Sequence, residues 1–221
     1  MLHGIVRWDW VIISAMKSNK QPTAGIVLAA GMSTRLGRTK QLLEVNGKIL
    51  VEWVVDAALK SELAEIILVL GHEQQKITDV LGKKAVLPRV QVVRAPDYRQ
   101  GMSRSLKAGL LVARRKYPSV MFLLGDQPLV TSETINRLLK EFWKSDKEIC
   151  VPVYRGKRGN PTLFSQKFYD ELSTIQGDIG ARDVIEAHLD GLHYVELKEP
   201  QEFFDVDTEK DLAAIKPFLP Q

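Results

Sequence analysis

The chain has 221 residues, of which 45% are hydrophobic and 26% charged, a balance typical of soluble globular proteins. Its formal net charge of +4 is spread along the sequence, which favours a small anionic substrate over a nucleic-acid partner. No run of about eighteen apolar residues is present, so we expect no membrane-spanning helix and no membrane partner. The single cysteine, Cys150, excludes an intramolecular disulfide and indicates a reducing, cytoplasmic compartment. Because Cys150 lies in an apolar run, we expect a buried structural thiol.

The first twenty residues are mildly apolar but are interrupted by Arg7 and Asp9. They lack the basic start and the small-residue cleavage site of a signal peptide. We therefore expect residues 1–20 to form a poorly ordered extension, with Met16 as an alternative start. Because the rest of the chain has no linker, repeat or low-complexity tract, we expect residues 21–221 to form a single domain.

Apolar strand patterns and amphipathic helix patterns alternate through the first two thirds of the chain. The run at 119–124 is continuously apolar, as expected for a strand that is covered on both faces of its sheet. Helices of this length between successive strands imply βαβ crossovers and a largely parallel sheet. We expect strands at 24–29, 65–70, 90–94, 119–124 and 148–153, and helices at 48–60, 72–81, 102–116 and 132–143.

The alternation changes after Val151, where a polar, glycine-rich loop covers 154–160. We expect a smaller, partly antiparallel elaboration beyond this point, closing over one end of the main sheet. The predicted fold class is therefore α/β: Rossmann-like, with a mostly parallel, doubly wound sheet and a small, partly antiparallel C-terminal elaboration. In this part we expect strands at 161–164, 192–197 and 202–206, and helices around 166–172, around 180–188 and from Thr208.

The first predicted strand runs into a loop that suits a polyphosphate. The stretch GIVLAAGMSTRLGRTKQLL, residues 25–43, places Gly31, Ser33, Arg35 and Lys40 directly after a buried-type strand. Glycine lets the backbone approach an anion closely, and successive N–H groups in such a loop form an anion-binding concavity. The two cations add fixed positive charge. The alternative is an ordinary glycine-rich turn, and the sequence is not a P-loop, because no Gly-Lys-Ser/Thr follows.

The strand at 119–124 delivers Asp126 to the same edge of the sheet, since ligands of doubly wound sheets bind beyond the carboxyl ends of the strands. A carboxylate near phosphates is costly unless it is paired with a cation, and Mg²⁺ bridging carboxylate and phosphate oxygens is the usual solution. The alternative is that Asp126 only caps the turn before Pro128 or the helix beyond it.

A second acidic pair, Asp205 and Asp207, ends the predicted strand EFFDV. Alternation places both on one strand face, from which they can reach the metal or a polar second substrate. The alternative for Asp207, and for Thr208, is capping of the terminal helix.

Polar residues also gather at the starts of two predicted helices. Ser103 and Ser105, with backbone amides, can bind an anion or the polar edge of a base, or can simply cap their helix. In GDIGARD, residues 177–183, Asp178 is either an N-cap of the helix that this segment opens or a substrate contact. Residues 159–161, Gly-Asn-Pro, are a turn by composition.

Together these segments resemble a known family. LAAGMSTRLGRTKQLL resembles the signature loop of the nucleotidyltransferases that activate cofactors and sugars. Four further pieces, PDYRQGMSRSLKAGL, LLGDQPLVT, GNPTLF with GDIGARDVI, and FDVDTEKDL, are similar to the molybdenum cofactor cytidylyltransferase branch. They follow the family's order and span residues 24–214.

The resemblance implies Mg²⁺-dependent transfer of CMP from CTP to the phosphate of molybdopterin, with release of pyrophosphate. Ala30 in LAAG favours cytosine, since guanylyl-transferring relatives tend to have glycine there. The alternatives are another NTP, a sugar-phosphate-like acceptor, or a non-catalytic carrier of molybdenum cofactor, and a transient contact with a molybdenum hydroxylase is also implied. The implied roles are catalysis for Arg35, Lys40 and Asp126; nucleotide binding for Leu28, Ala29, Ala30, Gly31, Ser33, Arg35, Lys40, Gly101, Ser103 and Ser105; metal binding for Asp126 and Asp207; and acceptor binding for Asn160, Asp178, Gly180 and Asp205.

Overall fold

The structure is a computed structural model that describes residues 21–33 and 38–220. The expected N-terminal extension, residues 1–20, and one expected catalytic residue, Arg35, lie outside the described residues. Within the described ranges, no helix combines the length and the apolar character that crossing a membrane requires.

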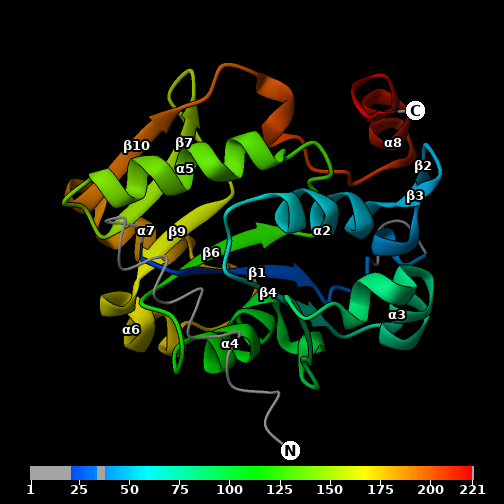
Figure 1. The fold of residues 1–221 in the computed structure, drawn as a ribbon, viewed down its shortest axis with the longest axis horizontal. Coiled ribbons are helices and arrows are strands. Elements are labelled where there is room, and N and C mark those ends of the chain that lie inside the picture. The colour runs from blue at the N-terminus through cyan, green and yellow to red at the C-terminus, as the bar shows by residue number, and fades with distance from the viewer. Residues whose placement is uncertain (1–20, 34–37, 221) are drawn as a thin grey trace, which may run out of the picture.

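The core of the fold is a twisted sheet of eight strands among the described residues, in the order β10-β7-β9-β6-β1-β4-β5, with β8 paired to β7 (Figure 1). The first strand, β1, pairs in parallel with β4 on one side and with β6 on the other. The chain therefore leaves β1 in one direction for β4 and β5 and returns to the other side for β6, which makes the β1/β6 boundary the topological switch point. The strands are β1 (Thr23–Ala29), β4 (Glu65–Leu70), β5 (Val90–Arg94), β6 (Ser119–Leu124), β7 (Ile149–Tyr154), β8 (Lys157–Arg158), β9 (Thr162–Ser165) and β10 (Leu192–Glu196).

The mostly parallel α/β fold is confirmed, but the antiparallel strands lie in an unexpected place. Strand β9 runs antiparallel between β6 and β7, and β10 then pairs in parallel with β7. The C-terminal part of the chain thus continues the main sheet instead of closing over one end of it. Strand β9 is buried along its whole length, as expected for a strand that lies inside a sheet.

The expected strand at 202–206 is wrong. A 3₁₀ helix, η7 (Pro200–Phe203), is followed by an extended segment without strand pairing. The apolar side chains of EFFDV pack in two different places instead of on one face of a strand. Val206 is fully buried in a small cluster, whereas Phe203 packs beside the main core.

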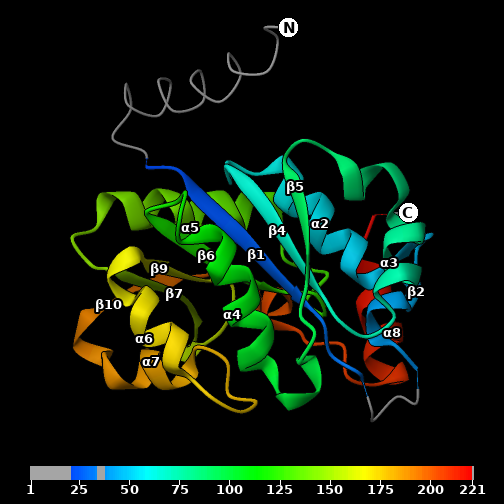
Figure 2. The same ribbon diagram turned by 90° about the horizontal axis from the view of Figure 1, so that it is seen from below.

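Helices cover both faces of the sheet, as the doubly wound prediction requires (Figures 1 and 2). On α2 the buried side chains Val51, Val54, Val55 and Ala58 recur at helical spacing and pack on the face that α3 and α5 also cover. Helices α4, α6 and α7 pack on the opposite face. The helices are α2 (Leu50–Lys60), α3 (Gln74–Leu81), α4 (Met102–Ala113), α5 (Ser132–Lys144), α6 (Tyr169–Thr174), α7 (Arg182–Ala187) and α8 (Glu209–Ile215).

A small hairpin precedes α2, so this helix begins two residues later than expected. Strands β2 (Glu44–Val45) and β3 (Lys48–Ile49) pair antiparallel around Asn46 and Gly47, which both have positive φ, the conformation that a tight hairpin turn needs. The hairpin packs with α8 around Val206 in the small cluster. Helix α8 begins with a capping box between Thr208 and Asp211, which confirms capping by Thr208. The remaining 3₁₀ helices are η2 (Lys40–Leu42), η3 (Gly82–Val86), η4 (Tyr98–Gln100), η5 (Gln166–Phe168), η6 (Leu189–Gly191) and η8 (Lys216–Phe218).

We expect Phe164→Ala to lower the free energy of unfolding by about 3–5 kcal/mol, because it empties a fully buried site in the inserted strand β9. The Phe164 ring lies 5.9 Å from that of Phe122 and 6.2 Å from that of Phe168, centroid to centroid. Urea denaturation measures the change, with Phe218→Ala as the control, since Phe218 is 59% exposed. Equal effects of the two substitutions would contradict this account of the core.

We expect Cys150 to resist alkylation by iodoacetamide at pH 8 in the folded protein and to react fully once the protein is unfolded. Its side chain is completely buried. Burial, reinforced by the charge of Glu141, raises the pKa of the Cys150 thiol to about 12, so the reactive thiolate is scarce at pH 8. Mass spectrometry of the native and denatured protein reads out the difference. Rapid labelling of the folded protein would show that the thiol is accessible.

Candidate active site

The centre of the candidate site is the ammonium group of Lys40, which two carboxylates hold. Lys40 Nζ lies 2.6 Å from Asp126 Oδ2 and 2.9 Å from Asp207 Oδ1. Lys40 follows the loop after β1, Asp126 follows β6, and Asp207 directly precedes α8. The Lys40 side chain is only 12% exposed. Three segments from distant parts of the sequence therefore meet at the carboxyl edge of the sheet, beside the switch point.

The two carboxylates decide the charge state of Lys40. Burial alone lowers the pKa of a lysine, because it disfavours the charged form. Here the charges and hydrogen bonds of Asp126, and then of Asp207, outweigh burial, so that the pKa of Lys40 is raised. Lys40 is therefore a fixed cation at neutral pH.

The strand ends around Lys40 are joined by short backbone contacts. The Lys40 amide donates to Ser33 Oγ at 2.9 Å, and the Gly125 amide donates to the Leu28 carbonyl oxygen at 2.9 Å. A Cβ on Gly125 would lie 2.9 Å from the Cβ of Ala29, so only glycine allows β6 to approach the end of β1 this closely. The structure thus places Asp126 beside the loop that carries Ser33 and Lys40.

Asp205 lies next to this centre but has a different partner. Its Oδ1 accepts a hydrogen bond from Gln127 Nε2 at 2.9 Å, while the Val206 amide donates to the Asp126 carbonyl oxygen at 3.1 Å. Burial, together with the nearby charge of Asp126, raises the pKa of Asp205. The expectation that Asp205 and Asp207 share one face of a strand is wrong, because the segment is not part of the sheet; the two side chains nevertheless lie on the same side of the molecule as Asp126.

The predicted acceptor segment contacts the start of α4. Asp178 Oδ1 accepts from the Met102 amide at 2.9 Å, and the Gly177 carbonyl oxygen accepts from the Ser103 amide at 3.1 Å. A Cβ on Gly101 would lie 2.5 Å from that carbonyl oxygen, and Gly101 has a φ of 105°. Asp178 therefore does not cap α7, the helix that its own segment opens, but satisfies α4, a helix 76 residues earlier in the chain.

The remaining predicted residues lie on α4, in the 177–183 segment and before β9. Ser103 and Ser105 lie on α4 and are 1% and 5% exposed. Gly180 has a φ of 63° and packs against Met102. Strand β9 begins opposite the end of β6, with Thr162 in register with Phe122, so Asn160 lies at the same edge of the sheet as Asp126.

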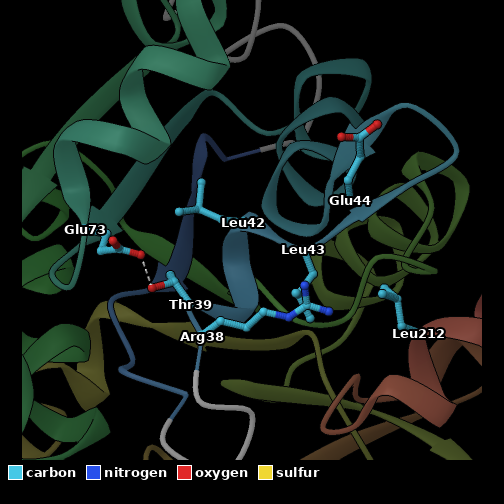
Figure 3. Close-up of a pocket in the computed structure, with 7 residues that line it drawn as sticks. All are labelled: Arg38, Thr39, Leu42, Leu43, Glu44, Glu73 and Leu212. Atoms are coloured by element: carbon cyan, nitrogen blue, oxygen red, sulfur yellow. Dashed lines mark hydrogen bonds between the residues drawn. The ribbon is translucent and has the colours of Figure 1, made fainter.

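Glu73 is a residue of the site that the sequence analysis missed. It follows β4 at the same edge, has a φ of 48°, and accepts a hydrogen bond from the Thr39 hydroxyl (Figure 3). The sequence contained a signal for Glu73, namely a carboxylate soon after a buried strand. The same signal led to the prediction of Asp126. Figure 3 also shows Arg38 extending between Thr39 and Leu212 across a cavity of about 350 Å³. A second cavity of about 490 Å³ is lined by Met32, Ser33, Arg38, Thr39, His72, Glu73 and Lys76.

The donor groups fit a divalent metal only in part. In residues 21–33 and 38–220, no three His, Cys, Asp or Glu side chains gather as a ready-made metal centre. Two carboxylate oxygens, from Asp126 and Asp207, do lie around one nitrogen, and hard oxygen ligands of this kind suit Mg²⁺ or Mn²⁺. Mg²⁺ normally takes one or two carboxylates and completes its shell with water and phosphate oxygens. The pair therefore fits a metal that is shared with a bound nucleotide.

A lysine held by two metal-ready carboxylates, at the switch point of a doubly wound sheet, is equipped to hold and transfer phosphates; the protein is a nucleotidyltransferase. Residues 25–192 match the family model described as the MobA-like NTP transferase domain, and the chain belongs to this family.

Curated relatives carry more than one activity. The chain is 25% identical over 200 residues to the probable molybdenum cofactor guanylyltransferase of Thermococcus sibiricus, covering 87% of this chain and 96% of the relative. It is 29% identical to the molybdenum cofactor cytidylyltransferase of Escherichia coli, covering 86% and 94%. It is 32% identical to the nicotine blue oxidoreductase of Paenarthrobacter nicotinovorans, covering 72% and 78%. Guanylyl and cytidylyl transfer both occur among these relatives.

The solved structures agree with the fold. The crystal structure of Rv0371c from Mycobacterium tuberculosis superposes with a TM-score of 0.78 at 26% identity, covering 90% of this chain and 99% of that one. A second structure of Rv0371c, in complex with manganese, superposes with a TM-score of 0.73 at 26% identity and covers 90% and 100%. A neighbour of this fold thus binds a divalent metal.

Proposed function

We propose that the protein transfers CMP from CTP to the phosphate of molybdopterin, or molybdenum cofactor, and releases pyrophosphate in a reaction that requires Mg²⁺. The observation that carries this proposal is the placement of Lys40 Nζ between Asp126 and Asp207 at the switch point. The chain matches two relatives named for molybdenum cofactor over nearly their whole length, and this supports molybdopterin as the acceptor. The choice of cytosine rests on Ala30, which directly follows β1.

The charges of the site support phosphoryl chemistry. Lys40, Asp126 and Asp207 together carry one net negative charge, which attracts a divalent cation and repels a triphosphate that carries no metal. Asp126 and Asp207 would hold Mg²⁺, which supplies charge neutralisation on the triphosphate. With both carboxylates engaged by a metal, the Lys40 ammonium would be available to the phosphates and would stabilise the leaving pyrophosphate.

The remaining residues position the two substrates. The backbone between Leu28 and Ser33 would line the triphosphate, and Arg35 would add a second cation. The attacking group is a phosphate that is already ionised, so no general base is needed. On the nucleotide side, the base would contact Gly101, Ser103 and Ser105. It would do so through polar groups that do not hydrogen-bond to residues 177–178. On the acceptor side we place Asn160, Asp178, Gly180 and Asp205.

The first test measures pyrophosphate release with CTP, GTP or ATP in the presence of molybdopterin and Mg²⁺. We expect CTP to give the highest kcat/KM. Faster release with GTP would make the enzyme a guanylyltransferase, and release with a sugar phosphate but not with molybdopterin would overturn the acceptor. Binding of CTP without turnover under any of these conditions would indicate a carrier.

The second test substitutes the central charges. We expect Lys40→Ala and Asp126→Ala each to lower kcat by about 10²–10³, or roughly 3 kcal/mol, as for the loss of one preorganised electrostatic group. The matched control is Lys84→Ala: Lys84 Nζ also lies between two carboxylates, 2.8 Å from Glu52 Oε1 and 2.6 Å from Asp56 Oδ1, but away from the site. We expect this variant to keep its kcat. Full turnover in the Lys40 and Asp126 variants would show that the site is assigned wrongly.

A further inference from the structure

Asp207 reaches Lys40 at the end of residues 203–207, which we call the strap: the last residue of η7 and the extended segment that follows it. No sheet ladder holds the strap, because its residues after η7 pair with no strand. Two of its backbone amides donate to neighbouring groups: Val206 to the Asp126 carbonyl oxygen at 3.1 Å, and Asp207 to Asp211 Oδ2 at 3.0 Å. Both bonds lie at the Asp207 end, so the position of the other end depends largely on where its side chains are seated.

The far end of the strap is seated on a glycine. The Phe203 ring lies directly on Gly159, and a Cβ added to Gly159 would overlap that ring. The ring centroid of Tyr154 lies 6.4 Å from that of Phe203 and forms a second wall of the seat. Gly159 is itself fixed, since its amide donates to the Pro152 carbonyl oxygen at 3.0 Å. Any side chain at position 159 must displace the ring.

We propose that Gly159 is a positioning residue that seats Phe203 and thereby holds Asp207 against Lys40. The resemblance to the family places the 159–164 segment near the acceptor. Gly159 itself acts instead on the metal side of the site. That consequence for metal use rests on the proposed function. The seating itself does not, because it is a property of the protein without substrates.

The first experiment measures the rate at which acetic anhydride modifies Lys40, by mass spectrometry, with Lys84 as the internal reference. Two carboxylates hold Lys40 Nζ, and loss of one contact must make the amine more reactive. We expect Gly159→Ala to raise the Lys40/Lys84 labelling ratio by about tenfold, within the range of coupling between residues in contact. Gly191→Ala is the matched control, since a Cβ there meets no atom within 4 Å. An unchanged ratio in Gly159→Ala overturns the proposal.

A double-mutant cycle separates seating from direct contact with a substrate. We expect Phe203→Ala to raise the Lys40 labelling ratio as well, and Gly159→Ala to add nothing once the ring is gone. Additive effects in the double variant would mean that Gly159 acts on something other than Phe203. Should Gly159→Ala fail to fold, as urea denaturation would reveal, Phe203→Ala with wild-type labelling of Lys40 still overturns the proposal.

The second experiment measures the Mn²⁺ concentration that gives half-maximal pyrophosphate release. We expect Gly159→Ala to raise this concentration by about tenfold at a kcat close to that of the wild type once metal is saturating. If no protein releases pyrophosphate but the labelling ratios change as expected, the proposed function fails and the seating stands. If the wild type is active and the metal requirement of Gly159→Ala is unchanged, the link between the strap and the metal is overturned.

Discussion

One ammonium group, the Nζ of Lys40, joins segments that the chain keeps far apart. Bringing a lysine and two carboxylates out of water costs hydration energy, which their mutual attraction offsets only while all partners are in place. Loss of Lys40 would remove the cation that both carboxylates contact and leave two like charges close together. The loop after β1, the end of β6 and the segment before α8 therefore share one electrostatic anchor, and the shape of the candidate site depends on it.

This anchor works because the sheet brings the three segments to one edge. Strands β1 and β6 are parallel neighbours, and their carboxyl ends lie side by side where the chain changes direction. Gly125 lets the end of β6 lie against β1 without a side chain between them. The same architecture explains why Lys40 lies at the edge of the sheet and not in the core. At this edge the backbone groups no longer pair with a neighbouring strand and can contact polar partners.

Much of this arrangement could be predicted from the sequence, because the relevant signals are local. The continuously apolar run at 119–124 identified β6, and its position after a helix implied a parallel strand; Asp126 followed from its place at the end of that run. The glycine loop and Lys40 followed from β1 in the same way. The same local signal was present at Glu73, which follows the end of β4 by three residues.

The parts that were not predicted depend on contacts between distant segments. EFFDV is rich in apolar residues, as a buried strand is, but whether a strand forms depends on a free sheet edge beside it, and the local sequence does not contain that information. The place of β9 inside the sheet, between β6 and β7, depends on the same long-range choice. The sequence alone also does not show which helix Asp178 caps. The same carboxylate could cap the helix that follows it or α4, and it caps α4.

The glycines of the motifs illustrate why a resemblance in sequence does not by itself assign a contact to a ligand. Gly101, Gly125 and Gly159 each admit another part of the chain: a carbonyl oxygen, the end of β1, and the Phe203 ring. Gly31 differs, since a Cβ there would meet, among the described residues, only Gln41 Nε2, at 3.8 Å. Open space of this kind is what the anion-binding role proposed for Gly31 requires. Gly101, Gly125 and Gly159 instead let segments of the chain approach one another.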